Sequence, residues 1–460
     1  MGSIKLMSVT KVEVEKVKDK MRRIVPFFLV ALVMMASLFG QANVTYAKTL
    51  DLDAQSAILV DADTGKVLFA KNPDEVLPPA SMTKMMTEYL VWEAVESGQI
   101  SWDTTTEISD YAYELSKNNA FSGVGLRQNK EYTVRDLYEA MAINSDNATT
   151  VALAELIAGS EGEFVKMMNE KAAEMGLTDY EFVNASGLDN ESLGDNYPEG
   201  TEPDATNLLS ARSTALLAFH LVNDYPEALE ISSIPETEFD EQQIRNWNWM
   251  LKHDASFLEQ FYYEGVDGLK TGYTELAGNN FTGTAIRDNQ RLITVVMNTD
   301  SRESRFEETA KLLDYGFNNF KKEELFKEGF QLQDMSTLPV AKGKEDKVEI
   351  ATEQAISTIL KNGEDEKYSI EYTIDKDKLN KDGELVAPIV KGEVIGTAEL
   401  VYDGEEEGYI FSDESKSQKV NLITTNEVEK KNWFMLTIGA IGDFFANLFS
   451  SIVDTIKGWF

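Results

Sequence analysis

The chain has 460 residues, but no cysteine and only two histidines. Without cysteine there is no disulfide bond, no thiolate nucleophile and no Cys-ligated zinc. His220 ends an apolar, helix-like run and is expected to pack in that helix, whereas His253 lies in a polar stretch and is expected at the surface. A Ser-His-Asp triad or a His-based metal site would need one of them. The composition favours another base, and we expect no metal and no other cofactor.

Basic residues are also scarce. The sequence has 43 lysines and arginines against 79 aspartates and glutamates, which gives a formal net charge of −36. A nucleic-acid-binding protein needs a basic footprint, so no nucleic-acid partner is expected. The acidic surface suits a secreted, soluble protein. The length predicts two or three domains.

The first 47 residues have the features of a secretory signal with a leading segment. Met21, Arg22 and Arg23 supply a basic start, and residues 24–40 form an uncharged apolar run. Residues 45–47 offer a small-residue cleavage site. We expect cleavage after Ala47 and export across the cytoplasmic membrane; the alternative is a retained membrane anchor.

The C-terminal segment, residues 427–460, is predicted to be an amphipathic helix. Its polar residues lie three or four positions apart and share one helix face: Asp443, Asn447, Ser450, Ser451, Asp454 and Lys457. The opposite face is apolar: Phe444, Phe445, Leu448, Phe449, Ile452, Val453 and Ile456. Such a helix suits the membrane interface. The alternatives are a helix packed on the protein itself and a transmembrane span.

Residues 48–328 are predicted to form a mixed α+β domain. Residues 53–71 have the pattern of a strand hairpin, and a helix is expected to begin near Ser81. The middle is mainly helical, and residues 266–271, 281–286 and 292–298 are predicted strands. A last helix is expected over residues 305–317. This order predicts an α+β fold.

Residues 329–426 are predicted to form a small all-β domain. Short alternating runs at residues 348–350, 368–372, 386–390, 393–399 and 408–410 are separated by Gly, Asp and Asn turns. We find no cluster of catalytic residue types in this segment. Its acidic runs lack the alternating ligand spacing of a calcium loop, so no metal site is predicted there.

Ser81-Met82-Thr83-Lys84 places a hydroxyl and an amine one helical turn apart, at a predicted helix start. A serine hydroxyl becomes a nucleophile when a base removes its proton. Lys84 can be that base if burial, a second cation or the helix end lowers its pKa. Taken alone, the pattern is more often a surface Ser and Lys at a helix N-terminus.

Ser145-Asp146-Asn147 supplies a second hydroxyl and an amide. Ser145 can relay a proton between Lys84 and a leaving amine, and Asn147 can hold Lys84 and a substrate peptide group. Asp146 is expected to point away and support the loop. The same string is a good helix N-cap before the helical run that follows, and the two roles are compatible.

Lys270-Thr271-Gly272 lies on a predicted strand. Gly272 has no side chain to obstruct an extended peptide that pairs with the strand edge. Lys270 and Thr271 can meet an anionic group such as a terminal carboxylate. Lys270 is also the second cation that can lower the pKa of Lys84. The alternative is a turn lysine before a strand.

Together these strings resemble the low-molecular-mass penicillin-binding proteins, and among them the serine-type D-Ala-D-Ala carboxypeptidases. The stretches Asn184-Ala185-Ser186-Gly187-Leu188 and residues 266–272 support the likeness, as do the β domain and the C-terminal helix. The resemblance implies that Ser81 forms an acyl-enzyme on peptidoglycan stem peptides, that Lys84 accepts its proton, and that β-lactams inhibit covalently. It also implies carboxylate binding by Lys270, Thr271 and Arg305, and an oxyanion hole made by the backbone N–H groups of Ser81 and Tyr273.

Three other functions stay open at this point. A class A-type β-lactamase needs a general-base glutamate, and no convincing Glu-x-x-Leu-Asn string lies between Ser145 and Lys270. A transpeptidase would use the same residues. An inactive wall-binding scaffold would not need Ser81, Lys84, Ser145 and Lys270 to be present.

Overall fold

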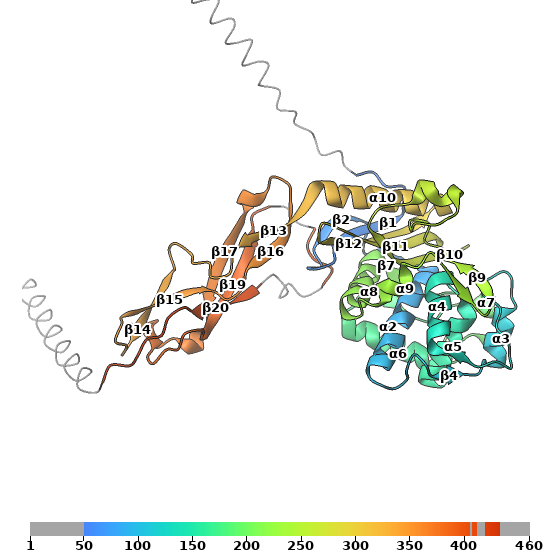
Figure 1. Cartoon of the computed structure of the whole chain (residues 1–460), viewed down its shortest axis with the longest axis horizontal. Coiled ribbons are helices and arrows are strands. Elements are labelled where there is room, and N and C mark those ends of the chain that lie inside the picture. The colour runs from blue at the N-terminus through green and yellow to red at the C-terminus, as the bar shows by residue number, and fades with distance from the viewer. Residues whose placement is uncertain (1–49, 405–406, 412–418, 433–460) are drawn as a thin grey trace, which may run out of the picture. The chain divides into compact units, whose positions relative to one another are not determined.

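The computed structural model describes residues 50–404, 407–411 and 419–432 (Figure 1). The predicted signal segment and most of the predicted C-terminal helix lie outside these residues. No helix within the described ranges is long and apolar enough to cross a membrane.

The first part of the described chain, the α+β domain (residues 52–319), is built on an antiparallel sheet. Its five strands lie in the order β10-β11-β12-β1-β2. Their bounds are β1 Ser56–Asp61, β2 Val67–Lys71, β10 Val266–Thr274, β11 Gly278–Arg287 and β12 Gln290–Thr299. Every residue of β1 is buried, as expected for a strand covered on both faces. Strand β10 lies at the edge of the sheet, so one side of it is open to a further strand.

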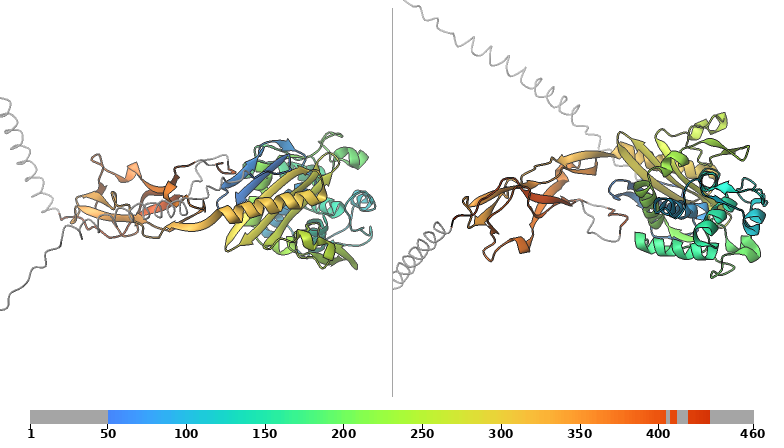
Figure 2. Two further views of the ribbon diagram at one scale, coloured as in Figure 1. Left: turned by 90° about the horizontal axis from the view of Figure 1, so that it is seen from above. Right: turned by 60° about the horizontal axis from the view of Figure 1, so that its bottom comes forward.

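Helices cover both faces of this sheet. Helix α10 (Arg302–Asn319) runs along one face, and the helical layer lies on the other (Figures 1 and 2). Gly316 allows α10 to approach closely, because a Cβ there would lie 2.5 Å from the Leu292 side chain. The helical layer contains η1 Ala80–Thr83, α2 Lys84–Glu96, α3 Asp110–Ser116, α4 Val134–Asn144, α5 Asn147–Ala158, α6 Glu161–Met175, α7 Asn190–Leu193, α8 Ala211–Asp224 and α9 Ala228–Ser232.

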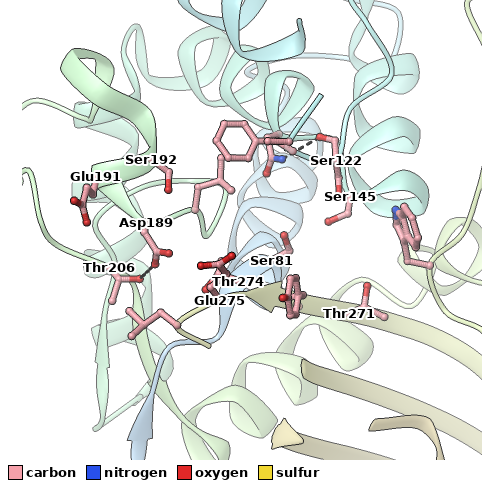
Figure 3. Close-up of a pocket in the computed structure, with 18 of the residues that line it drawn as sticks. Ser81, Ser122, Ser145, Asp189, Glu191, Ser192, Thr206, Thr271, Thr274 and Glu275 are labelled. Atoms are coloured by element: carbon pink, nitrogen blue, oxygen red, sulfur yellow. Dashed lines mark hydrogen bonds between the residues drawn. The ribbon is translucent and has the colours of Figure 1, made fainter. Parts of the chain in front are cut away.

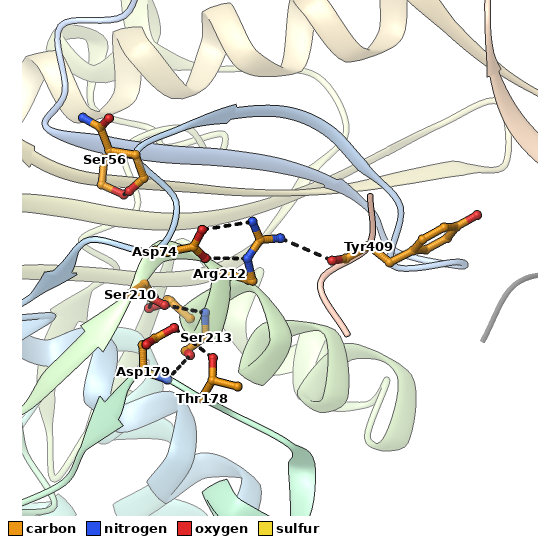
Figure 4. A network of polar contacts seen from close by, with 10 residues as sticks. Ser56, Asp74, Thr178, Asp179, Ser210, Arg212, Ser213 and Tyr409 are labelled. Carbon is orange, nitrogen blue, oxygen red and sulfur yellow. Dashed lines mark hydrogen bonds and ion pairs between the residues drawn. The ribbon is translucent and has the colours of Figure 1, made fainter. Parts of the chain in front are cut away.

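Helix α8 shows how the sequence sets the helix starts. The Ser210 hydroxyl accepts a hydrogen bond from the Ser213 N–H at 3.0 Å, a standard N-cap (Figure 4). Arg212 pairs with Asp74 at 2.6 Å, and the Ser213 hydroxyl accepts from the Asp179 N–H at 3.2 Å. The first turn of α8 is therefore also tied to two neighbouring loops.

Short elements complete the α+β domain. They are β3 Val76–Leu77, β4 Thr105–Thr106, β5 Tyr132–Thr133, β6 Tyr180–Glu181, η2 Gly194–Asn196, β7 Leu208–Ser210, β8 Glu236–Phe239, β9 Gln242–Arg245 and η3 Ser256–Phe261.

The C-terminal β domain (residues 320–431) begins with strand β13, because β13 pairs with β16 of the same domain. Its first residue therefore lies nine positions before residue 329, where the sequence predicted the start of the β domain. Its larger sheet has the order β17-β19-β20-β15-β14-β18. Its core is aliphatic and includes Val348, Ile350, Ile395, Leu422 and Val428. The elements are β13 Phe320–Phe326, β14 Thr337–Ala341, β15 Lys347–Thr352, β16 Ile356–Lys361, η4 Asp365–Lys367, β17 Tyr368–Ile374, η5 Lys376–Lys378, β18 Leu385–Val386, β19 Val394–Tyr402 and β20 Lys419–Thr424.

The predicted α+β fold followed by a β-rich domain is confirmed, with three local differences. The last helix begins at Arg302 instead of Arg305. The run predicted over residues 386–390 keeps only its first residue in a strand, because Pro388 has no N–H to donate. Residues 408–410 form only an isolated bridge at Tyr409, next to Gly408 at φ 80°.

Candidate active site

The nucleophile candidate lies on a tight turn that leads into α2. Ser81 is in the short 3-10 helix η1, and Lys84 is the first residue of α2. The Lys84 Nζ lies 3.1 Å from the Ser81 Oγ. Ser81 is half-buried, while Lys84 is completely buried. The turn therefore presents the hydroxyl to the surface cavity and keeps the amine beneath it.

The Lys84 amine has two further partners, which come from different loops. It donates to Asn147 Oδ1 at 2.8 Å and to the Ser186 carbonyl oxygen at 2.6 Å. Burial lowers the pKa of Lys84 well below its ordinary value, and the charge of Lys270 lowers it further. A neutral Lys84 amine can accept the Ser81 hydroxyl proton while it donates to the other two oxygens.

The Ser145-Asp146-Asn147 string joins α4 to α5. Asp146 is the N-cap of α5, and its second oxygen accepts from the Val124 N–H at 2.7 Å, so it supports the loop as predicted. Burial raises the pKa of the Asp146 carboxyl. Asn147 donates to the Ser122 carbonyl at 3.0 Å while it accepts from Lys84. Ser145, in the left-handed conformation at φ 62°, lines the same cavity as Ser81, without a hydrogen bond to Lys84 in this structure.

Strand β10 forms the opposite wall. Thr271, Gly272 and Tyr273 line the cavity, and Lys270 is buried just behind them at 2% exposure. Burial lowers the pKa of the Lys270 ammonium. A Cβ on Gly272 would lie 2.4 Å from the Pro79 carbonyl oxygen. The missing side chain thus lets β10 pack against the turn that carries Ser81, a role in addition to the predicted clearance for a peptide.

Arg305 of α10 reaches this wall from below. Its Nη1 donates to the Gly272 carbonyl at 3.3 Å, and its buried Nε has no hydrogen-bond partner among the described residues. Burial lowers the pKa of the guanidinium to about 9, which still leaves it charged at neutral pH. Arg305 and the neighbouring Arg302 both line the cavity, so this end of it is cationic.

All of these walls enclose one cavity of about 660 Å³ (Figure 3). Of the predicted site residues, it is lined by Ser81, Ser145, Asn147, Thr271, Gly272, Tyr273 and Arg305, while Lys84 and Lys270 lie beneath its surface. The lining of the cavity also includes the carboxylates of Asp189, Glu191, Asp204 and Glu275. A nucleophile, a buried amine with a lowered pKa and a cationic wall around one cavity are the parts that acyl transfer needs.

Two backbone groups of the site were not identified as such from the sequence. The Ser186 carbonyl accepts from Lys84, and the Ser122 carbonyl holds Asn147. The signal for Ser186 was the Asn184–Leu188 stretch, which supported the resemblance but had no assigned role. Gly187, at φ 83°, packs on the Ser81 turn: a Cβ there would lie 2.0 Å from the Ala80 carbonyl oxygen. No local pattern marks Ser122.

The sequence matches two families of known proteins. Residues 43–301 match the family described as D-alanyl-D-alanine carboxypeptidase, and residues 320–430 match the family described as penicillin-binding protein 5, C-terminal domain. The D-alanyl-D-alanine carboxypeptidase DacF of Bacillus subtilis is 33% identical over 388 residues, which cover 84% of this chain and 92% of that protein.

Solved structures give the same relationship. A peptidoglycan synthesis regulatory factor (PBP3) from Streptococcus pneumoniae is 36% identical with a TM-score of 0.68, and the match covers 82% of this chain and 99% of that one. Penicillin binding protein 5 from Haemophilus influenzae is 30% identical with a TM-score of 0.64, covering 83% of this chain and 98% of that one.

Proposed function

The chain belongs to the serine-type D-alanyl-D-alanine carboxypeptidase family of penicillin-binding proteins, and we propose that it removes the last D-Ala of peptidoglycan pentapeptides through an acyl-serine on Ser81. The observation that carries this mechanism is the 3.1 Å contact between the Lys84 Nζ and the Ser81 Oγ, with the amine buried and its pKa lowered.

Acylation begins with a proton transfer. The neutral Lys84 amine takes the hydroxyl proton of Ser81 as the Oγ bonds to the carbonyl carbon of the penultimate D-Ala. The C–N bond to the terminal D-Ala then breaks, and Ser145 passes the proton from Lys84 to the leaving amine. Water, activated by the same lysine, hydrolyses the ester and restores the serine.

The substrate binds along the exposed edge of β10 as an added strand. Its terminal carboxylate meets the cationic wall formed by Lys270 and Arg305, and the Thr271 hydroxyl donates to it. The Asn147 amide holds a peptide group. The backbone N–H groups of Ser81 and Tyr273, two residues that line the cavity, stabilise the oxyanion.

The test uses a D-Ala-D-Ala peptide and a fluorescent penicillin. The wild-type protein should release D-Ala and carry a covalent label on Ser81. Ser81→Ala should lose both activities while it keeps its thermal unfolding profile, because only a partly exposed hydroxyl is removed. A Ser81→Ala protein that still carries the covalent label would refute this nucleophile, and a rapidly lost wild-type label would favour a β-lactamase.

We also propose that the enzyme acts outside the cytoplasmic membrane, which the predicted signal and the predicted C-terminal helix both support. Residues 1–47 act as a cleaved signal, and the amphipathic residues 427–460 attach the protein to the membrane surface. Removal of residues 432–460 should therefore release the signal-cleaved protein from lipid vesicles and leave peptide hydrolysis unchanged. Flotation measures this: a truncated protein that still floats with vesicles would locate the anchor elsewhere.

A further inference from the structure

The C-terminal β domain carries a strip of exposed apolar side chains that the active site does not use. Residues 385–390 alternate between buried and exposed positions, as in a strand with one face on the core. The buried positions are Leu385, Ala387 and Ile389. The exposed positions, which we call the apolar strip, are Val386, Pro388 and Val390. Outward positions of a half-buried strand are usually polar, so three apolar ones in succession indicate an interaction.

Exposed hydrophobic side chains are concentrated in this part of the chain. Ten large hydrophobic side chains of the described residues are exposed, and three of them, Val386, Val390 and Val394, fall within nine positions. Val390 is 63% exposed. Single exposed hydrophobic residues are normal, whereas grouped ones mark surfaces that bind a partner.

The backbone of the strip already has hydrogen-bond partners inside the β domain. The Ala387 N–H donates to the Ala341 carbonyl, next to the end of β14, at 3.0 Å. Ile389 and Val428 exchange two hydrogen bonds of 3.0 Å each. Pro388 has no N–H to donate. A partner of the strip therefore meets its apolar side chains and does not add a strand to it.

The pair formed by Ile389 and Val428 also limits the distance between the strip and the proposed membrane anchor. The described chain ends at Asn432, and the apolar part of the C-terminal segment begins at Trp433, five positions after Val428. An extended chain spans at most about 3.6 Å per residue, so Val428 lies within about 18 Å of Trp433. If the anchor lies in the membrane interface, the strip lies close to the same surface.

Charges around the strip are balanced, although the whole chain has a formal net charge of −36. Residues 376–394 contain four lysines and four acids, and residues 427–432 contain two of each. Glu429 is paired with Lys344, and Lys391 at the end of the strip is exposed. Anionic lipids repel an acidic surface, but this repulsion is screened beyond about 10 Å at 0.1 M salt. This end of the β domain can therefore approach a membrane that the acidic surface elsewhere disfavours.

We propose that the apolar strip is a second membrane contact: Val386, Pro388 and Val390 enter the headgroup region of the bilayer beside the C-terminal anchor. This inference rests on the membrane attachment proposed above. A single attachment leaves the β domain free to turn about it, whereas two contacts fix the orientation of this domain to the membrane. The strip contributes to binding by burying apolar area.

The direct test uses the absence of cysteine from the chain. Val390→Cys in the full, signal-cleaved protein supplies one thiol for an environment-sensitive NBD fluorophore. On vesicles of phosphatidylethanolamine and phosphatidylglycerol, its emission should shift to shorter wavelength and be quenched by a nitroxide-labelled lipid. Ile286→Cys is the matched control, because Ile286 is an exposed aliphatic residue on β11 of the α+β domain. Its emission should not change.

A second measurement gives the contribution of the strip to affinity. Val386→Ser combined with Val390→Ser changes only exposed side chains, so thermal unfolding and acylation should stay as in wild type. Its partition constant for the same vesicles should fall about tenfold, because two valines no longer leave water on binding. Ile286→Ser should bind as wild type does.

Two results would overturn the proposal: an unshifted probe at position 390 in a protein that floats with vesicles, or an unchanged affinity of the double serine variant. A shift that needs no vesicles and grows with protein concentration would assign the strip to a second copy of this chain, and would also overturn it. A full chain that does not float at all would refute the C-terminal anchor and the strip together, so failure of the anchor is distinguishable from failure of the strip alone.

Discussion

The α+β domain and the C-terminal β domain differ in what they bury. The α+β domain encloses six charged residues around or beneath its cavity: Lys84, Glu88, Asp146, Glu161, Lys270 and Arg305. In the C-terminal β domain, the buried polar side chains of the described residues are three threonines, Thr352, Thr358 and Thr424. Both domains have hydrophobic cores, so the difference does not come from the ability to pack.

The difference separates an interior that contains charged groups of a catalytic site from an interior that only packs. A buried charge lowers the free energy of unfolding. An uncharged residue of similar volume would fill the same space with a smaller loss of stability. Shifted pKa values cluster at sites that move protons. The six buried charges around the cavity are therefore explained by the proposed acyl transfer, while the described interior of the β domain follows from packing alone.

The largest expected effect comes from fixing the charge of the base. Lys84→Arg keeps a cation but replaces it with a guanidinium, which does not release its proton at working pH. Acylation by fluorescent penicillin should fall about 10²–10⁴-fold, the usual contribution of a general base.

Lys252→Arg serves as the control for this change, since Lys252 is exposed and should tolerate arginine. Near-normal acylation by Lys84→Arg would show that Lys84 contributes to packing and not to proton transfer. Catalysis would then not explain why the α+β domain buries charges and the β domain does not.

A smaller effect is expected from glycines with the same backbone conformation in the two domains. Gly187 and Gly363 both have φ 83°, but a Cβ meets the Ala80 carbonyl at 2.0 Å in the first case and nothing within 4 Å in the second. Gly187→Ala should displace the Ser81 turn and lower acylation about tenfold or more, because small shifts in catalytic geometry are costly.

Gly363→Ala should cost only about 1–2 kcal/mol of unfolding free energy, from the left-handed backbone, with acylation unchanged. Stopped-flow labelling and chemical denaturation measure the two quantities. Equal acylation by both variants would show that the Asn184–Leu188 loop does not position the nucleophile.

The sequence predicted those parts of the site whose geometry is local. Ser81 and Lys84 are separated by one turn, and the Asp146 cap follows from the residue types before α5. The strand that carries Lys270 was predicted over residues 266–271, and β10 spans Val266–Thr274. The order of elements also predicted the α+β fold, because hairpin, helical and strand patterns each have a distinct period.

The remaining features depend on contacts between segments far apart in the chain. The Ser186 carbonyl reaches Lys84 across 102 positions, and no residue type marks a backbone acceptor. The packing role of Gly272 depends on Pro79, which belongs to another element. Glu88 lies in an otherwise ordinary helical run, and its hydrogen bond from Tyr138 exists only after α2 packs against α4.

The smallest expected effect concerns stability and Asp61, a buried acid of the α+β domain outside the cavity. Burial raises its pKa from 3.8 to about 6, although Thr64 donates to its carboxylate at 2.9 Å through the backbone N–H. Between these two pH values the folded state binds more protons than the unfolded state. The stabilising contribution of protonated Asp61 is therefore present below the unfolded pKa and is lost as pH rises through about 6.

Asp61→Asn removes this titration and keeps an oxygen that accepts from Thr64. The difference in the free energy of unfolding, variant minus wild type, should increase by up to about 3 kcal/mol from pH 4 to pH 7. Urea denaturation at both pH values gives the difference, and a constant offset between the two proteins would contradict the prediction. The C-terminal β domain offers a comparison within the same molecule: its described interior contains no buried acid, so a probe of its own unfolding should show no matching pH dependence from this source.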